Sequence, residues 1–246
     1  LPFLLFSLGA YGIFVASGIA TGVAMVASIF FLVKKFGYRP HPRLHMPTLS
    51  KVAHYSSANY LANIFNIAPT ILLPLIILNH LGSAAAGYYF LAFTIATLLY
   101  AVIYAVSQSL FAEGSFSENN LHILIRKSFL ILLALLIPGS LIVFFSADVA
   151  LQMFGKTYAA EAASILKILS LAAPVVALYT LSSLILRIKK QMSALIAVNT
   201  LYLISIGGLS YLWVDKGLVW IGYAWLFGNL ITGLTGLFYL LLRRKN

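Results

Sequence analysis

The chain has 246 residues, of which 62% are hydrophobic and 9% are charged, and its formal net charge is +11. A soluble domain of this length carries about 25% charged residues, and its surface could not hide so many apolar side chains. The composition therefore excludes a soluble globular fold. The absence of cysteine also excludes disulfides, thiolate metal sites and a cysteine nucleophile.

Seven apolar segments follow one another along the chain. They lie at 8–33, 53–80, 84–112, 122–146, 158–186, 191–213 and 217–242. Most reach the roughly 20 residues that a helix needs to cross ~30 Å of hydrocarbon. A span must satisfy its own backbone hydrogen bonds, and the alternating pattern of a barrel is missing. We therefore predict an all-α polytopic membrane protein with about seven transmembrane helices.

The connections between these segments differ in length and polarity. The turn at 81–83 is so short that 53–80 and 84–112 should form an antiparallel hairpin. Residues 147–155 should form a short outer helix that ends at Gly155. Segment 36–50 is polar and rich in proline, and we interpret it as a linker that leads into a helical turn near Ser50.

The basic residues mark one side of the membrane. All but three of the 16 lie in the loops after the first, third and fifth segments or at the C-terminus. Of the other three, Lys156 and Lys216 lie in the opposite loops and Lys167 lies inside a span. Positive loops stay in the cytoplasm, so we predict a cytoplasmic C-terminus and an external N-terminus. The chain begins inside an apolar run, which we interpret as a fragment of a longer protein.

Two neighbouring segments each carry one polar stripe at helical spacing. Tyrosine, asparagine and glutamine suit sugars, because rings stack on pyranose faces and polar ends bond hydroxyls. The stripes equally suit hydrogen bonding between helices, and the sequence leaves both interpretations open. Lys167 could face the same cavity and pair with a phosphate, or extend to the interface. The candidate cavity residues are Asn59, Asn63, Asn66, Thr70, Tyr100, Tyr104, Gln108 and Lys167.

Several kinds of chemistry are not expected. All five acidic residues lie at helix ends or in loops, so no proton or sodium site is evident within the spans. The histidines at 41, 45 and 54 have no acidic or thiolate companion for a metal site. No phosphate-binding loop, nucleophile elbow or carboxylate pair is present. We expect no catalytic residue, no metal, no cofactor and no nucleic-acid partner.

Several short runs resemble oligosaccharide flippases, the O-antigen and polysaccharide exporters of the multidrug/oligosaccharidyl-lipid/polysaccharide superfamily. The runs are YSSANYLAN at 55–63, LPLI at 73–76, AGYY at 86–89, VSQSLFAEG at 106–114, FGKTYA at 154–159 and ILKIL at 165–169. Members of that family have two six-helix lobes. The resemblance implies that 1–35 is the last transmembrane helix of the N-terminal lobe, 36–50 a cytoplasmic basic linker, and 51–246 the C-terminal lobe.

The same resemblance implies a transport function in the cytoplasmic (inner) membrane. The protein would flip a polyprenyl-pyrophosphate-linked oligosaccharide, such as an O-antigen unit for lipopolysaccharide, by alternating access. Its partners would be this lipid-linked substrate, membrane lipids and polysaccharide assembly proteins. Cationic residues matter in the cavities of such proteins, and here Arg126 and Arg187 are expected near the inner mouth, beside Lys167 within a span.

Three other functions remain open from the sequence. A cation-coupled multidrug exporter of the same superfamily would need membrane carboxylates, which these spans do not provide but a first lobe could. A membrane-embedded glycan polymerase or ligase would need a large outer loop, and the longest outer connection, near 147–157, is short and apolar. A structural membrane scaffold would leave the polar stripes unexplained.

Overall fold

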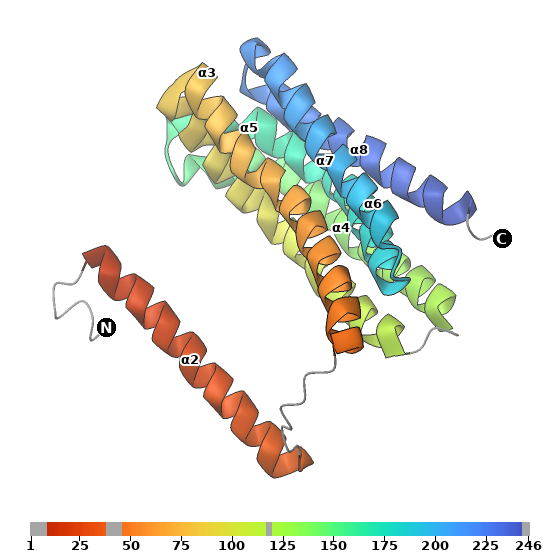
Figure 1. The fold of residues 1–246 in the computed structure, drawn as a ribbon. Coiled ribbons are helices and arrows are strands. Elements are labelled where there is room, and N and C mark those ends of the chain that lie inside the picture. The colour runs from red at the N-terminus through yellow and green to blue at the C-terminus, as the bar shows by residue number, and fades with distance from the viewer. Residues whose placement is uncertain (1–8, 38–45, 117–119, 243–246) are drawn as a thin grey trace. The chain divides into compact units, whose positions relative to one another are not determined.

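The structure is a computed structural model that describes residues 9–37, 46–116 and 120–242. Within these ranges all regular structure is helical, which confirms the predicted all-α class. The chain separates into two units, 1–49 and 50–246, and each is taken here by itself. The helices are α2 (Gly9–Phe36), α3 (Met46–Phe116), α4 (Leu121–Gln152), α5 (Lys156–Leu171), α6 (Ala173–Ile188), α7 (Met192–Trp213), the 3-10 turn η2 (Val214–Lys216) and α8 (Leu218–Leu242) (Figure 1).

Helix α3 consists of two legs that reverse at Gly82. As one straight helix its 71 residues would be about 107 Å long, more than three times the thickness of the hydrocarbon core. Gly82 has φ 85° and ψ 176°, a conformation that only glycine adopts readily because it has no Cβ. Residues 63–70 of one leg and 97–108 of the other line one cavity, so the legs lie antiparallel, as the short turn predicts.

The segment predicted at 158–186 is a broken span. Helix α5 ends at Leu171, α6 starts at Ala173, and the two are bent by 45°. Pro174 lies in the first turn of α6 and has no N–H to donate to the preceding turn, which favours a bend at this point. The sequence pattern showed one apolar run here because both halves are apolar.

Two other boundaries were predicted wrongly. Residues 147–152 are not a separate outer helix: they continue α4, which runs unbroken to Gln152. Helix α3 begins at Met46, inside the predicted linker at 36–50, and does not start at a turn near Ser50. Residues 38–45 of that linker, the histidines at 41 and 45, and the basic cluster at 243–245 lie outside the described residues.

The number of spans agrees with the sequence. Five of the described helices are long and apolar enough to cross a membrane, and the bent pair α5–α6 makes a sixth. Counting the two legs of α3 separately gives seven. The protein is therefore a multi-pass membrane protein, while the predicted lobe boundaries and the orientation in the membrane remain predictions.

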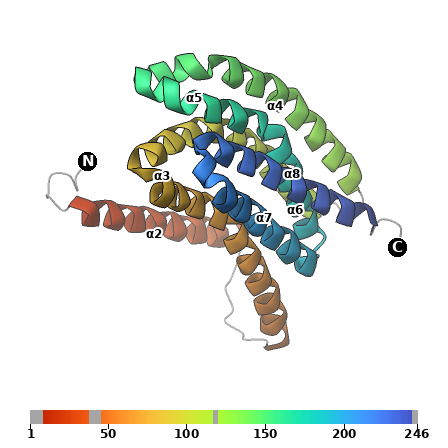
Figure 2. The same ribbon diagram turned by 90° about the horizontal axis from the view of Figure 1, so that it is seen from above.

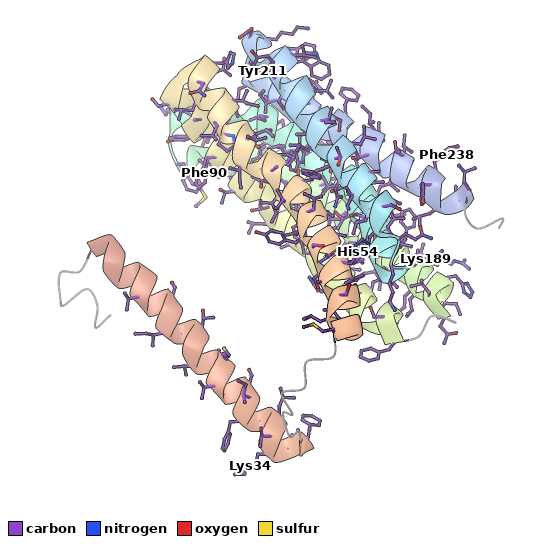
Figure 3. The ribbon with its side chains drawn as sticks, viewed as in Figure 1. Lys34, His54, Phe90, Lys189, Tyr211 and Phe238 are labelled. Carbon is purple, nitrogen blue, oxygen red and sulfur yellow. The ribbon has the colours of Figure 1, made fainter. Side chains whose placement is uncertain are left out.

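In the unit 50–246 the helices lie side by side as a bundle (Figures 1 and 2). Glycines let α8 approach its neighbours closely: a Cβ on Gly233 would lie 3.1 Å from the Tyr179 backbone nitrogen of α6. Close approach through small residues is how membrane helices gain packing energy. Tyr211 lies toward one end of the bundle and Lys189 toward the other (Figure 3).

Candidate substrate cavity

A cavity of about 410 Å³ lies inside the unit 50–246. Its walls are the two legs of α3 and one face of α6, and α7 and α8 contribute one aromatic residue each. Six of the eight residues proposed from the sequence line it: Asn63, Asn66, Thr70, Tyr100, Tyr104 and Gln108. Asn59 and Lys167 do not. The further lining residues are Ile67, Phe93, Thr97, Ser107, Phe111, Val176, Tyr179, Thr180, Ser183, Leu184, Arg187, Tyr202 and Trp225.

The local helical geometry explains why the stripes meet. Residues three and four positions apart lie on one face of a helix, so each leg of α3 presents its polar stripe in one direction. The reversal at Gly82 turns both faces toward the same space. Asparagine in a lipid-facing position would be costly, and burial of this face against α6 avoids that cost.

One hydrogen-bond network joins the cavity wall to the packing of three helices. The Asn66 amide donates to the Tyr179 hydroxyl over 2.7 Å, and that hydroxyl donates to the Asn199 side-chain oxygen over 2.8 Å. Ser183 donates to the same oxygen over 3.2 Å. The Asn199 amide donates to the Ala62 carbonyl over 2.9 Å. The network fixes α3, α6 and α7 relative to one another and holds Tyr179 at the cavity.

Aromatic rings form one side of the cavity. Tyr179 and Tyr202 stack with ring centroids 4.0 Å apart and planes 3° apart. Phe93 meets Trp225 edge to face at 5.1 Å, and Tyr202 and Tyr100 lie within 6.3 Å of the same indole. Interlocked rings of this kind are rigid, and all but Phe93 are buried, so they act mainly as a fixed apolar wall of the cavity.

Polar groups without internal partners provide the remaining surface. In the described part of the chain Asn63, Tyr104 and Gln108 have no hydrogen-bond partner although all three line the cavity. The Thr70 and Thr97 hydroxyls each donate 2.6 Å bonds to a carbonyl of their own helix, at Ile67 and Thr94. Their oxygens remain able to accept. The cavity can therefore both donate to and accept from a hydroxylated ligand.

Arg187 is the positive charge at this cavity. It lies in the last turn of α6, and its Nε is buried with no hydrogen-bond partner among the described residues. No aspartate or glutamate is among the described residues that line the cavity. An unpaired guanidinium facing neutral polar groups favours an anionic ligand, because its fork of donors matches a phosphate.

Two of the eight candidate residues lie outside this cavity, and a third lines it with its hydroxyl proton already in use. Lys167 is not in the cavity: its Nζ lies 2.6 Å from an Asp148 carboxylate oxygen, and the pair joins α5 to α4. Asn59 is also outside, with its side-chain oxygen buried and without a partner in the described chain. The Tyr100 hydroxyl donates to the Leu169 carbonyl beside the α5–α6 bend, so its proton is already used within the protein and its oxygen can only accept.

Sequence reasoning expected Arg187 near the inner mouth but missed the other residues that α6 contributes to the wall. Tyr179, Thr180, Ser183 and Arg187 lie at helical spacing on one face, which is the same signal that identified the stripes of α3. The signal was weaker here because most of α6 is apolar and serine can bond its own backbone. Asn199, 0% exposed, could have been noticed as a lone amide within an apolar span.

Comparisons with known proteins agree with the fold. The model of a family described as "Polysaccharide biosynthesis protein" matches residues 3–160. A solved structure of a mutant of MATE has TM-score 0.85 at 13% identity, covering 97% of this chain and 57% of the other. The structure of MATE in the straight conformation has a TM-score of 0.81 at 15% identity, covering 98% of this chain and 58% of the other. The chain thus spans a little over half the length of those proteins. No curated protein matches.

Proposed function

The chain belongs to the polysaccharide biosynthesis protein family, and we propose that it forms part of a transporter that flips a polyprenyl-pyrophosphate-linked oligosaccharide across the cytoplasmic membrane. The membership confirms the resemblance seen in the sequence. The observation that supports this cargo is the lining of the cavity: neutral amides and hydroxyls, a set of interlocked rings, and one arginine that has no partner in the described part of the chain.

The physical obstacle for such a cargo is the glycan. Each hydroxyl brought unpaired into hydrocarbon costs several kcal/mol. Asn63, Tyr104 and Gln108 have unused donors and acceptors that can replace the hydrogen bonds of water. The partly exposed ring of Phe93, which packs edge to face on the buried Trp225, can lie against a pyranose face. The polyprenyl tail needs no such shelter and stays in the bilayer.

The pyrophosphate would lie against Arg187. Charge-assisted hydrogen bonds between guanidinium and phosphate oxygens are about twice as strong as neutral ones. At about 410 Å³ the cavity is near the lower end of the range for small-molecule sites. We therefore assign it to the pyrophosphate and the sugar next to it, with the rest of the glycan outside this cavity.

The alternative cargo is an amphipathic cation, as in a multidrug exporter of the same superfamily. A cation would need a carboxylate or a similarly placed negative group in the low-dielectric interior. Among the described residues at this cavity the only full charge is positive. This favours the anionic cargo over the cationic one.

Movement between inward and outward openings would use the existing breaks in the helices. The α5–α6 bend at Ala172 is 45°, and it lies directly beside the Tyr100 hydroxyl bond to Leu169. Broken helices at the substrate site are a recurring feature of transporters that rock between two states. On this proposal, cargo that contacts the second leg of α3 changes the angle of the bend. That change in turn moves the face of α6 that lines the cavity.

The test is transport by the full-length protein in proteoliposomes, with a fluorescently labelled undecaprenyl-pyrophosphate-linked oligosaccharide as cargo. Asn63→Leu and Gln108→Leu each remove an unpartnered amide and should slow transport roughly five- to tenfold, at about 1 kcal/mol per bond. Asn59→Leu is the matched control, because it removes an amide one turn away that does not line the cavity. It should leave the rate within about twofold.

The charge is tested in the same assay. Arg187→Gln should reduce transport roughly 10- to 100-fold, since a hydrogen bond to a charged group contributes about 1.5–3 kcal/mol. Lys127→Gln removes an equal charge from an exposed position outside the cavity and should have little effect. If Arg187→Gln transports the lipid-linked glycan normally, or if the protein instead moves ethidium and is inert toward the glycan, the proposal is wrong.

A further inference from the structure

A second hollow lies on the other side of α6. It is a groove of about 740 Å³ between α4, α6 and α8. Unlike the substrate cavity, its walls are almost wholly aliphatic along most of their length. Its lining residues are Leu121, His122, Ile125, Arg126 and Phe129 of α4, Leu178, Leu181, Ser182, Ile185 and Lys189 of α6 and its C-terminal end, and Leu237, Leu240 and Leu241 of α8.

Helix α6 separates this groove from the substrate cavity. At 100° per residue, the α6 residues that face the groove and those that face the cavity centre roughly 180° apart on the helix. Tyr179 and Ser183 thus look toward the cavity, while Leu178 and Ile185 look toward the groove. The two spaces are on opposite faces of one helix, so the groove is not an extension of the cargo site.

The back wall of the groove is formed where α6 and α8 touch. A Cβ at Gly233 would lie 3.1 Å from Leu178 Cγ, and one at Gly236 would lie 2.9 Å from Ser182 Cβ. These glycines let the two helices pack closely, so no gap is left in the back wall of the groove. The Ser182 hydroxyl donates to the Tyr179 carbonyl of its own helix over 2.9 Å, so it presents no unsatisfied group to the groove.

The groove has the depth of one leaflet. Along α6 it extends from Leu178 to Lys189, which at 1.5 Å per residue is about 16 Å. Half of a ~30 Å hydrocarbon core is about 15 Å. Its deep end is apolar, with Phe129 and Leu178. His122 and Lys189 lie toward the other end, and Arg126 lies on α4 between His122 and Phe129, from where its long side chain can extend toward that end.

Positive charge rims that end. Arg126 and Lys189 come from different helices and line the same groove, and His122 lies one turn from Arg126. Neither basic residue forms an ion pair with an acid of the described chain; the pairs found there are Lys167–Asp148 and His80–Asp215. Lys189 projects at this end of the bundle (Figure 3). The loop charges predict this end to be cytoplasmic, where anionic lipids concentrate.

We propose that this groove is a binding site for an anionic glycerophospholipid. Its acyl chains lie along the leucine-lined walls of α4, α6 and α8, and its phosphate is held between Arg126 and Lys189. The match is one of shape and charge together: an apolar channel about one leaflet long along α6, with two cations that have no acidic partner among the described residues. The site is independent of the proposed cargo, because it lies behind α6. A bound lipid would brace α4 against α6 on the face opposite the cavity.

The experiment is native mass spectrometry of the full-length protein released from detergent, with added palmitoyl-oleoyl phosphatidylglycerol. Phosphatidylcholine with the same chains tests the headgroup, and glycerol 3-phosphate tests the headgroup without chains. Arg126→Gln/Lys189→Gln should weaken phosphatidylglycerol binding roughly 30-fold, the equivalent of about 1 kcal/mol for each basic residue. The control Lys127→Gln/Lys190→Gln loses the same charge at adjacent exposed positions outside the groove and should bind within about threefold of the parent.

The chains are tested separately. Leu237→Trp places a large ring in the groove and should displace phosphatidylglycerol, while Leu234→Trp, one turn earlier on α8 and outside the groove, should not. If the two double variants lose phosphatidylglycerol binding equally, general surface charge explains the effect and the proposal is wrong. Binding of glycerol 3-phosphate as tight as that of the lipid, or retention of the lipid by Leu237→Trp, would also overturn it.

Discussion

Asn199 is the residue whose removal should destabilise the bundle most specifically. Its side chain is 0% exposed in α7 and makes three hydrogen bonds to other helices: it accepts from Tyr179 and Ser183 of α6 and donates to the Ala62 carbonyl of α3. Asn199→Ala removes all three bonds at once. It leaves two hydroxyls and a carbonyl to find new partners in an apolar interior.

The magnitude follows from the number of bonds. Side-chain hydrogen bonds within membrane proteins contribute about 0.6 kcal/mol on average and at most about 1.7. Three of them make a loss of roughly 2 kcal/mol, to which the vacated volume adds a cavity term. The control is Asn229→Ala in α8. That side chain is equally buried, but its amide donates only to the Trp225 carbonyl of its own helix.

The two variants therefore lose the same side-chain atoms and differ in the bonds that cross between helices. The free energy of unfolding can be measured by denaturant titration of the purified protein in mild detergent, followed by helical circular dichroism. We expect Asn199→Ala to lose about 1–2 kcal/mol more than Asn229→Ala. Equal losses would mean that the network contributes nothing beyond packing, and the reasoning from these hydrogen bonds would be refuted.

Three other substitutions test the fold and the corrected site. Gly228→Ala should cost about 1–3 kcal/mol of unfolding free energy, because the new Cβ would overlap the Ile206 side chain and lie 3.1 Å from the Ile206 backbone nitrogen. The control is Gly208→Ala, whose Cβ would have no neighbouring atom within 4 Å. It should be neutral or slightly stabilising in the same titration. Gly82→Ala should cost about 1–2 kcal/mol, because a side chain is disfavoured at φ 85°. Lys167→Gln should change stability by less than about 1 kcal/mol and leave glycan transport in proteoliposomes unchanged, because its exposed pair with Asp148 lies outside the cavity.

The membrane fold was predictable because lipid leaves few choices. Apolar segments of about 20 residues must be helices, and a two-residue or three-residue turn must reverse them. The hairpin at Gly82 and the ends of α7 and α8 followed from these rules. The break at Ala172 did not, because apolarity alone does not distinguish a straight span from a bent one. Only Pro174 carried that information, and proline is common in membrane helices.

The cavity was predictable where polarity was concentrated. Asparagines are costly in lipid, so a row of them must face the interior, and Asn63 and Asn66 do line the cavity. The sequence could not show which of them are used internally. Asn66 bonds Tyr179, while the Asn63 side chain has no hydrogen-bond partner among the residues that the structure describes. The difference depends on which helix lies opposite.

The sequence could not show which basic residue lies at the cavity, for a related reason. Lys167 lies deep within an apolar run, and the cost of burying a lysine suggested a function. In the structure Asp148, at the far end of α4, reaches it. Residues 19 positions apart in sequence meet because α4 and α5 are antiparallel neighbours. Of the two arginines expected near the inner mouth, Arg187 lines the cavity and Arg126 lines the groove on the other side of α6.

The network also makes a sharper test of how cavity and packing are coupled. The Tyr179 hydroxyl accepts a hydrogen bond from Asn66 and donates its single proton to Asn199. Donating to Asn199 polarises the hydroxyl, so its oxygen accepts more strongly from Asn66. Tyr179→Phe therefore removes both bonds. In that background Asn66→Ala should cost less unfolding free energy than it does in the parent, by roughly 0.6 kcal/mol or more. Additive losses in this double-mutant cycle would show that the Asn66 bond to Tyr179 contributes no stability. Non-additive losses would mean that any ligand competing for the Asn66 amide also loosens the contact between α3 and α6.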